Sequence, residues 1–179
     1  MSDITIIPVA CGSSLPLETV RVRIQTAFRC TVAVSEASVH LASAFDPSRH
    51  QYHSGDVLAS LLSAFPGRGK LLGITGMDLF LPVLTFVFGQ AQLNDRAAVF
   101  STFRLRNEYY GLPPDAGLLI ARSLKEGIHE LGHTFGLHHC RDNPCVMNSS
   151  TYVEDIDIKP ETFCMACLET LARAEKSPP

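Results

Sequence analysis

The sequence predicts a protein of the α+β class, α/β-like in its core, with a largely parallel sheet. Strand-like and helix-like patterns alternate through the first hundred residues, which is typical of βαβ units. Two strand-like runs follow at residues 85–92 and 97–103, and the four residues between them make a link short enough to favour an antiparallel pair. Of the 179 residues, 46% are apolar and 18% are charged, so the chain can bury a core without disulfides.

Each remaining element rests on a local pattern. Short apolar or β-branched runs predict strands at residues 4–10, 31–40 and 71–75. Helices are expected where apolar residues recur at helical spacing, at residues 17–28, 57–65, 116–135 and from about 160 to 174. Ser14 and Ser54 are the expected caps of the first two helices. The turn chemistry of Asn94 and Asp95 suits the link of the antiparallel pair.

Length and composition exclude several classes of protein. A chain of 179 residues favours a single domain over residues 1–179. The net charge of −3 gives no basic excess, which argues against nucleic acid as a partner. The longest apolar stretch, residues 79–89, is broken by Pro82 and falls short of the roughly 20 residues of a membrane helix. Asp3 stands where a secretory signal would be basic, so we expect a cytoplasmic protein, and we expect it to be a monomer.

A histidine motif carries the clearest chemistry. Residues 129–139 read His-Glu-Leu-Gly-His-Thr-Phe-Gly-Leu-His-His. His129 and His133 lie one turn apart on the same face of a helix, where two imidazoles can bind one zinc ion. Glu130 is adjacent to His129, from where its carboxylate can serve as a general base without filling the open coordination position.

A third ligand requires the helix to end. His139 follows His133 by six residues, and in a continuing helix it would be rotated by about 600° onto a largely opposite face. Gly136 can adopt the positive φ that bends the chain between them. On spacing alone, His138 is an alternative ligand. The other histidines are expected to be surface or structural residues: His40, His50 and His53.

Four of the six cysteines lie together in the last quarter of the chain: Cys140, Cys145, Cys164 and Cys167. Four thiolates suit a closed, structural zinc site, which would hold the loop that carries His139. Two disulfides or an iron–sulfur cluster are the alternatives. A reducing cytoplasm opposes disulfides, and the spacing lacks the ferredoxin runs. Cys11 and Cys30 are expected to be buried thiols that pack as small hydrophobic residues.

The pattern His129-Glu130-x-x-His133-x-x-Gly136-x-x-His139 resembles the zinc signature of the metzincin metallopeptidases. The residues that follow make it similar to the archaemetzincins: Cys140, Cys145, Met147, Cys164 and Cys167. The specific match covers residues 129–167, and a looser likeness extends back to about residue 70. The resemblance implies a metzincin fold, with a twisted, mostly parallel five-stranded sheet and one antiparallel edge strand above the cleft. It also places the third ligand at His139.

The same resemblance implies roles for three further features. Residues 85–92 would be the edge strand, which would bind an extended peptide by strand addition; an ordinary core strand has the same pattern. Met147 would form a hydrophobic base beneath the imidazoles, whereas on pattern alone it is a core methionine. Tyr152 is a candidate hydrogen-bond donor to the transition state, because some metzincins use a tyrosine after the methionine.

Together these features predict a zinc-dependent metallopeptidase that hydrolyses the peptide bonds of a peptide or protein. Two zinc ions are expected per chain, one catalytic and one structural. Two rivals stay open: a non-catalytic or latent zinc-binding protein that retains the site, and a zinc hydrolase for a non-peptide amide. Glu130 favours catalysis, because a site that only binds zinc has less need of a carboxylate beside its first ligand.

Overall fold

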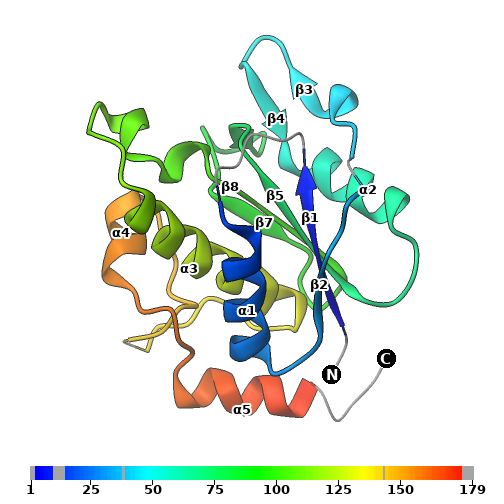
Figure 1. Cartoon of the computed structure of the whole chain (residues 1–179), viewed down its shortest axis with the longest axis vertical. Helices are drawn as coiled ribbons and strands as arrows, with labels where there is room; N and C mark the ends of the chain where they lie inside the picture. Colours follow the sequence, from blue (N-terminus) through cyan, green and yellow to red (C-terminus); the bar gives the residue numbers. More distant parts are fainter. Residues whose placement is uncertain (1–2, 10–14, 38, 143, 175–179) are drawn as a thin grey trace.

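The central sheet is built from five strands in the order β2-β1-β5-β8-β7, as the computed structural model in Figure 1 shows. The structure describes residues 3–9, 15–37, 39–142 and 144–174. Four neighbouring strands are parallel: β2 (Val32–Val34), β1 (Ile4–Val9), β5 (Lys70–Thr75) and β8 (Ala97–Ser101). The edge strand β7 (Gly89–Ala91) runs antiparallel to β8. The predicted fold class is therefore confirmed.

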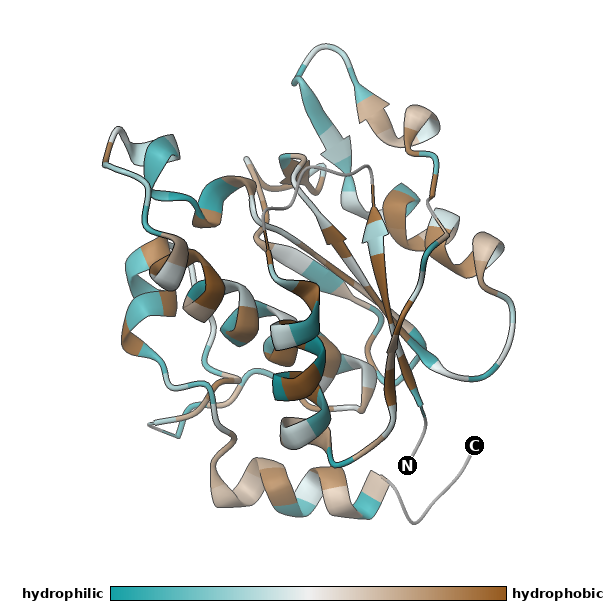
Figure 2. Ribbon diagram, viewed as in Figure 1, coloured by the Kyte–Doolittle hydropathy of each residue, from teal (hydrophilic) through white to brown (hydrophobic). Residues whose placement is uncertain are grey.

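Helices cover both faces of this sheet because both faces of its parallel strands are apolar. Ile4 and Ile6 of β1 belong to the larger core, under α1 (Leu17–Phe28) and α3 (Ala116–Thr134). Ile7 and Val9, on the opposite face, pack in a second core under α2 (Ser54–Ala64). In Figure 2 brown, hydrophobic stretches occur in the central strands and in the helices that cover them. Within the described residues, no helix combines the length and the apolar character that a membrane span needs.

A second, smaller sheet was not predicted. Its order is β3-β4-β6, with β3 (Phe45–Asp46), β4 (Gln51–His53) and β6 (Leu79–Phe80). The short 3-10 helix η1 (Ala42–Ala44) leads into it, and two more, η2 (Phe103–Leu105) and η3 (Asn107–Tyr110), follow β8. Strands of two or three residues are too short to show an alternating pattern in the sequence.

Several predicted boundaries are wrong for identifiable reasons. The strand expected at residues 31–40 is limited to β2, because the Ser35 hydroxyl accepts the N–H of Ala37 at 3.0 Å and turns the chain away. Ser54 does not cap α2: it is the first helical residue, and its hydroxyl donates to the carbonyl of Phe80 at 3.0 Å. The other expected cap, Ser14, lies outside the described residues, as does Ala10 at the end of the first predicted strand.

The antiparallel pair is shorter than predicted at both of its strands. Of residues 85–92, only Gly89–Ala91 form β7, because the carbonyl of Thr85 accepts hydrogen bonds from Arg49 and Gln51 instead of from a strand. The run at residues 97–103 ends as a strand at Ser101. There the Ser101 hydroxyl accepts the N–H of Phe103 at 3.0 Å and starts a turn of 3-10 helix.

The helix expected from about residue 160 to 174 is α5 (Met165–Ala174), which begins five residues later than predicted. A short helix that was not predicted, α4 (Val153–Ile158), precedes it. Between the two helices the chain is tied to the loop after the metal centre, because the carbonyl of Thr162 accepts the N–H of Val146 at 2.9 Å. The long helix predicted at residues 116–135 is α3, with Asp115 as its cap.

Candidate metal centre and active site

The helix α3 presents four chemically active side chains on one face. Its start is fixed by Asp115, whose carboxylate accepts the N–H of Leu118 at 2.8 Å. Glu126, His129, Glu130 and His133 then follow at spacings of three, four and seven residues, so they project from the same side. Three of these side chains are buried, and that of His133 is partly buried. Buried polar side chains of this kind require hydrogen-bond or ion-pair partners, and the surrounding loops supply them.

The end of α3 directs the chain back over this face. Gly136 has a φ of +88°, the left-handed conformation that glycine adopts without steric cost. The N–H of Leu137 bonds to the carbonyl of Gly132 at 3.0 Å, and that of Gly136 to the carbonyl of His133 at 2.9 Å. These two bonds form a Schellman motif. The predicted bend at Gly136 is therefore confirmed, and it brings His139 beside the helix.

The imidazoles of His129, His133 and His139 meet at one point, with a nitrogen of each within 4.8 Å of the others. The Nδ1 of His129 faces the carbonyl of Val146 at 2.9 Å, and the Nδ1 of His133 faces that of Leu137 at 2.7 Å. A carbonyl only accepts, so both Nδ1 atoms carry the proton. Burial lowers the pKa of all three imidazoles, that of His129 well below its usual range, which favours the neutral form.

The donor set fits a zinc ion. The carbonyls of Val146 and Leu137 favour the neutral tautomer in which Nδ1 carries the proton and Nε2 carries a lone pair. The Nε2 atoms of His129 and His133 face each other at 3.2 Å. Two lone pairs at this separation repel unless a cation lies between them. Two nitrogens bound tetrahedrally at 2.0–2.1 Å would be about 3.3–3.4 Å apart, close to the observed separation. His138 is exposed and lies outside the described trio.

Glu130 is buried directly beneath the edge strand. Glu130 is 6% exposed. Burial raises the pKa of its carboxyl well above the usual range; the nearby Glu126 adds to this rise, and Lys159 opposes it. A Cβ added at Gly89 of β7 would lie 2.6 Å from Oε1 of Glu130. The carboxylate therefore packs against the backbone of β7, in a space that no other residue type at position 89 would leave open.

A cavity of about 330 Å³ joins the imidazoles to the edge strand. Its lining comes from segment 84–89, from α3 and from the loops that follow it, and includes Glu126, His129, Glu130, His139, Ser150, Thr151 and Lys159. Tyr152 is not among these residues: it is 68% exposed and occupies the N-cap of α4. The structure therefore gives no support to Tyr152 as a donor in this cavity.

Sequence reasoning missed a buried ion pair in the cavity wall. The Nζ of Lys159 lies 2.8 Å from Oε1 of Glu126, and both side chains are less than 5% exposed. The same ammonium donates to the carbonyl of Asn148 at 3.4 Å. The two partners are 33 residues apart, so no local pattern could have paired them. The pair ties α3 to the chain that follows Met147.

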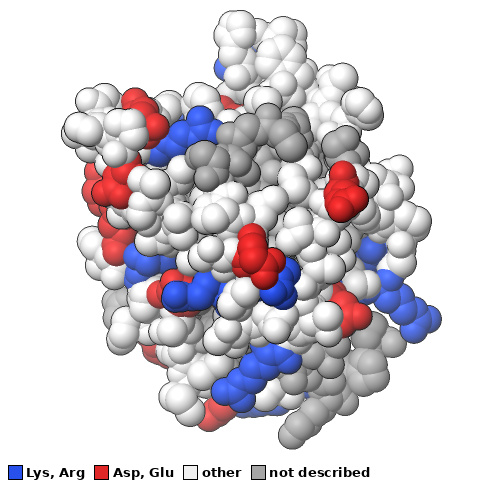
Figure 3. All heavy atoms as spheres, viewed as in Figure 1, with Lys and Arg blue, Asp and Glu red and all other residues white. Residues whose placement is uncertain are grey.

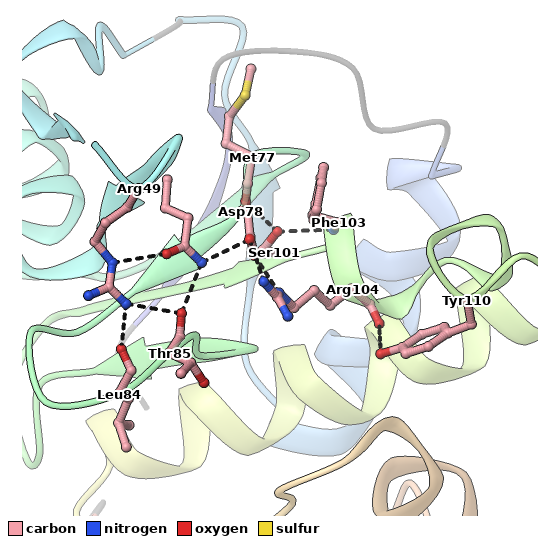
Figure 4. A network of polar contacts seen from close by, with 10 residues as sticks. Arg49, Met77, Asp78, Leu84, Thr85, Ser101, Phe103, Arg104 and Tyr110 are labelled. Carbon is pink, nitrogen blue, oxygen red and sulfur yellow. Dashed lines mark hydrogen bonds and ion pairs between the residues drawn. The ribbon is translucent and has the colours of Figure 1, made fainter. Parts of the chain in front are cut away.

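Figure 4 shows a polar network that includes Leu84 and Thr85, two of the residues that line the cavity. Arg49 donates to the carbonyls of Leu84 and Thr85 at 2.7 and 3.1 Å. Behind it, Asp78 accepts two hydrogen bonds from Arg104, both at 2.7 Å. A bidentate pair of this kind fixes orientation as well as distance. The small second sheet thus fixes the segment that leads into β7.

The four clustered cysteines also converge. Their Sγ atoms lie within 4.8 Å of one another, with Cys140–Cys164 and Cys145–Cys167 each at 3.7 Å. This is far longer than the 2.05 Å of a disulfide, and all four are free thiols. Four sulfurs bound tetrahedrally at 2.3 Å would be about 3.8 Å apart. The cluster therefore fits a zinc ion, and the disulfide alternative is not observed.

This cluster adjoins the histidine trio through Met147. The N–H of Cys140 donates to the carbonyl of Met147 at 2.9 Å, and Asn148 donates to the carbonyl of Cys140 at the same distance. Met147 is fully buried. A Cβ added at Gly132 would lie only 2.5 Å from the Met147 sulfur. Met147 therefore packs against α3 between the two helical histidines. The expected role of Met147 as a hydrophobic base beneath the imidazoles stays a prediction.

The remaining candidate residues lie elsewhere. His40 and His50 are exposed, and His53 is half-buried at the start of α2, with Nδ1 3.0 Å from Asp56. Cys30 is half-buried and packs against the larger core, so the expectation of a buried thiol is met only in part. Cys11 lies outside the described residues.

Comparison with known proteins identifies the family of the chain. The model of peptidase family M54 matches residues 14–173. An archaemetzincin of Methanocaldococcus jannaschii is 43% identical over 128 residues, which cover 72% of this chain and 70% of the relative. One of Thermococcus kodakarensis is 45% identical over 133 residues, covering 73% and 72%. The crystal structure of archaemetzincin from Methanopyrus kandleri has a TM-score of 0.85 at 35% identity, covering 98% of this chain and 97% of that one.

A helix bearing His-Glu-x-x-His, a third histidine after a glycine bend and an antiparallel strand above them define a zinc metallopeptidase. The family match and the relatives specify which kind. This chain belongs to peptidase family M54, the archaemetzincins.

Proposed function

We propose that the chain holds two zinc ions with different roles. His129, His133 and His139 would bind the catalytic ion, and the four clustered cysteines would bind the structural one. The observation that supports this division is the ligand chemistry. Three neutral imidazoles leave a coordination position open, whereas four thiolates close the site. An iron–sulfur cluster is the alternative at the cysteines, and metal analysis distinguishes the two.

Glu130 would be the general base of the peptidase. When bound at the imidazoles, zinc supplies a Lewis acid that activates water and polarises a carbonyl. Glu130 accepts the proton on its carboxylate and delivers it to the leaving amine. Its buried position excludes bulk water, and the positive charge of the metal centre favours its ionised form, which opposes the effect of burial on its pKa. The single observation that supports this role is the carboxylate buried one residue from His129.

The substrate is a peptide, and we propose that it binds along β7 in an extended form. The strand is the last in the sheet order, so one edge of it has no strand partner among the described residues. Strand addition at such an edge supplies main-chain hydrogen bonds without a sequence requirement. The adjoining cavity would receive side chains next to the cleaved bond.

We further propose a monomer of one domain that works in the cytoplasm without a nucleic acid partner. A reducing compartment keeps the four clustered thiols available for zinc. Over the face shown in Figure 3, acidic and basic side chains are interspersed, which does not resemble the clustered basic surface that binds a phosphate backbone.

Metal analysis and a peptide screen test the two-zinc proposal together. We expect two zinc ions per chain, and cleavage of some members of a broad peptide panel that a chelator abolishes and added zinc restores. One zinc per chain with four titratable thiols would refute the structural site. Metal-replete protein that cleaves no peptide would favour the latent rival.

A further inference from the structure

The ladder between β7 and β8 determines which backbone groups of the edge strand remain available. The N–H of Ser101 donates to the carbonyl of Phe88 at 2.8 Å, and the N–H of Gln92 donates to that of Ala97 at 2.9 Å. In the register of this pair, Gly89 faces Phe100 and Ala91 faces Ala98. Alternate residues of an antiparallel strand direct their N–H and C=O groups to opposite sides. Those of Gly89 and Ala91 therefore point to the outer edge.

The same glycine is the point at which the edge strand contacts the proposed base. A Cβ at position 89 would lie 2.6, 2.7 and 2.8 Å from Oε1, Cγ and Cδ of Glu130. The three nearest atoms all belong to this one side chain, so the steric demand of a residue at position 89 would fall first on Glu130. Glu130 is 6% exposed and also lines the cavity, so an added methyl group would displace its carboxylate from the strand.

These two observations give one position two functions. We propose that Gly89 is a positioning residue of the peptidase, which lets the Glu130 carboxylate pack against the strand at the residue where a bound peptide would pair. The inference rests on the proposed role of Glu130 as general base. The consequence is a fixed register for the bound peptide. The peptide residue that forms hydrogen bonds with Gly89 is held beside the base and the imidazoles, and the peptide residue two positions away is held by Ala91.

The test is a double-mutant cycle between Gly89 and Glu130. In Gly89→Ala, the added methyl group displaces the carboxylate, and a displacement of about 1 Å can cost about 100-fold in rate. We expect kcat to fall by about that factor, with KM within about threefold and both zinc ions retained. In the Glu130→Asp background, the shorter side chain withdraws from position 89. There Gly89→Ala should cost less than about threefold, because the two changes act on one contact.

Two results would overturn the inference. One is a Gly89→Ala enzyme with the kcat of the parent protein. The other is an equal loss in both backgrounds, since a weakened pairing of β7 with β8 would act regardless of which acid stands at position 130. Failure of the proposed function would be seen differently, as a Glu130→Asp variant that hydrolyses peptides as fast as the parent protein.

Discussion

Gly136 decides whether the third imidazole reaches the other two. Its φ of +88° and the two hydrogen bonds of the Schellman motif turn the chain within three residues of His139. This feature was predictable from the sequence because it is local: the spacing of His133 and His139 demands a bend, and only one residue type between them adopts it freely. Long-range contacts at the same site were not predictable. Neither the pairing of Lys159 with Glu126 nor the contact of Gly89 with Glu130 leaves a sequence pattern.

The substitution Gly136→Ala tests this geometry at the residue scale. A left-handed conformation costs a non-glycine residue about 1–2 kcal/mol, so we expect unfolding of the zinc-free protein to require less denaturant. Zinc affinity at the imidazoles should also fall, because His139 is displaced. The matched control is Gly117→Ala in the first turn of the same helix, where an added Cβ meets only Asp115, at 3.4 Å. Equal behaviour of the two variants would contradict the proposed importance of the bend.

At the scale of elements, the cysteine cluster connects α5 to the loop that leaves the metal centre. Cys164 and Cys167 flank the start of α5, and Cys140 follows His139 directly. The helices α1, α2 and α3 were predictable because their apolar residues repeat over three turns or more. The strands β3, β4 and β6 and the helix α4 were not. They have two to six residues and are held by tertiary hydrogen bonds such as those of Arg49 and Gln51.

Cys167→Ser is the corresponding test of this connection. It replaces a buried thiolate ligand with a hydroxyl group, which binds zinc poorly, so we expect the loss of one zinc ion per chain. If the cluster supports His139, the remaining zinc should also be removed faster by a chelator, as measured by release into a zinc-sensitive dye. Cys30→Ser, outside the cluster, should keep both ions and the parent release rate. A Cys167→Ser protein that loses one ion but releases the other at the parent rate would show that the two sites are independent.

At the scale of the whole molecule, the sheet order places its one antiparallel strand over the helix that carries the site. The parallel strands are covered on both faces, whereas β7 lies at the edge of the sheet (Figure 1). Gly89 of this edge strand packs against Glu130. This arrangement was predicted only through the resemblance of residues 129–167 to a known family, because sequence periodicity does not specify which strand lies at an edge. The Methanopyrus kandleri structure matches the fold with a TM-score of 0.85, and this match covers 98% of the chain.

The central claim is that zinc at the three imidazoles and the Glu130 carboxylate hydrolyse peptides together. It is tested most directly by measuring kcat/KM of Glu130→Gln on a cleaved peptide, with zinc content determined on the same sample. Glutamine keeps the shape of the side chain but does not accept a proton at neutral pH. We predict two zinc ions per chain and a loss of about 10²–10⁴-fold in kcat/KM. Unchanged turnover in a fully zinc-loaded variant would contradict the account.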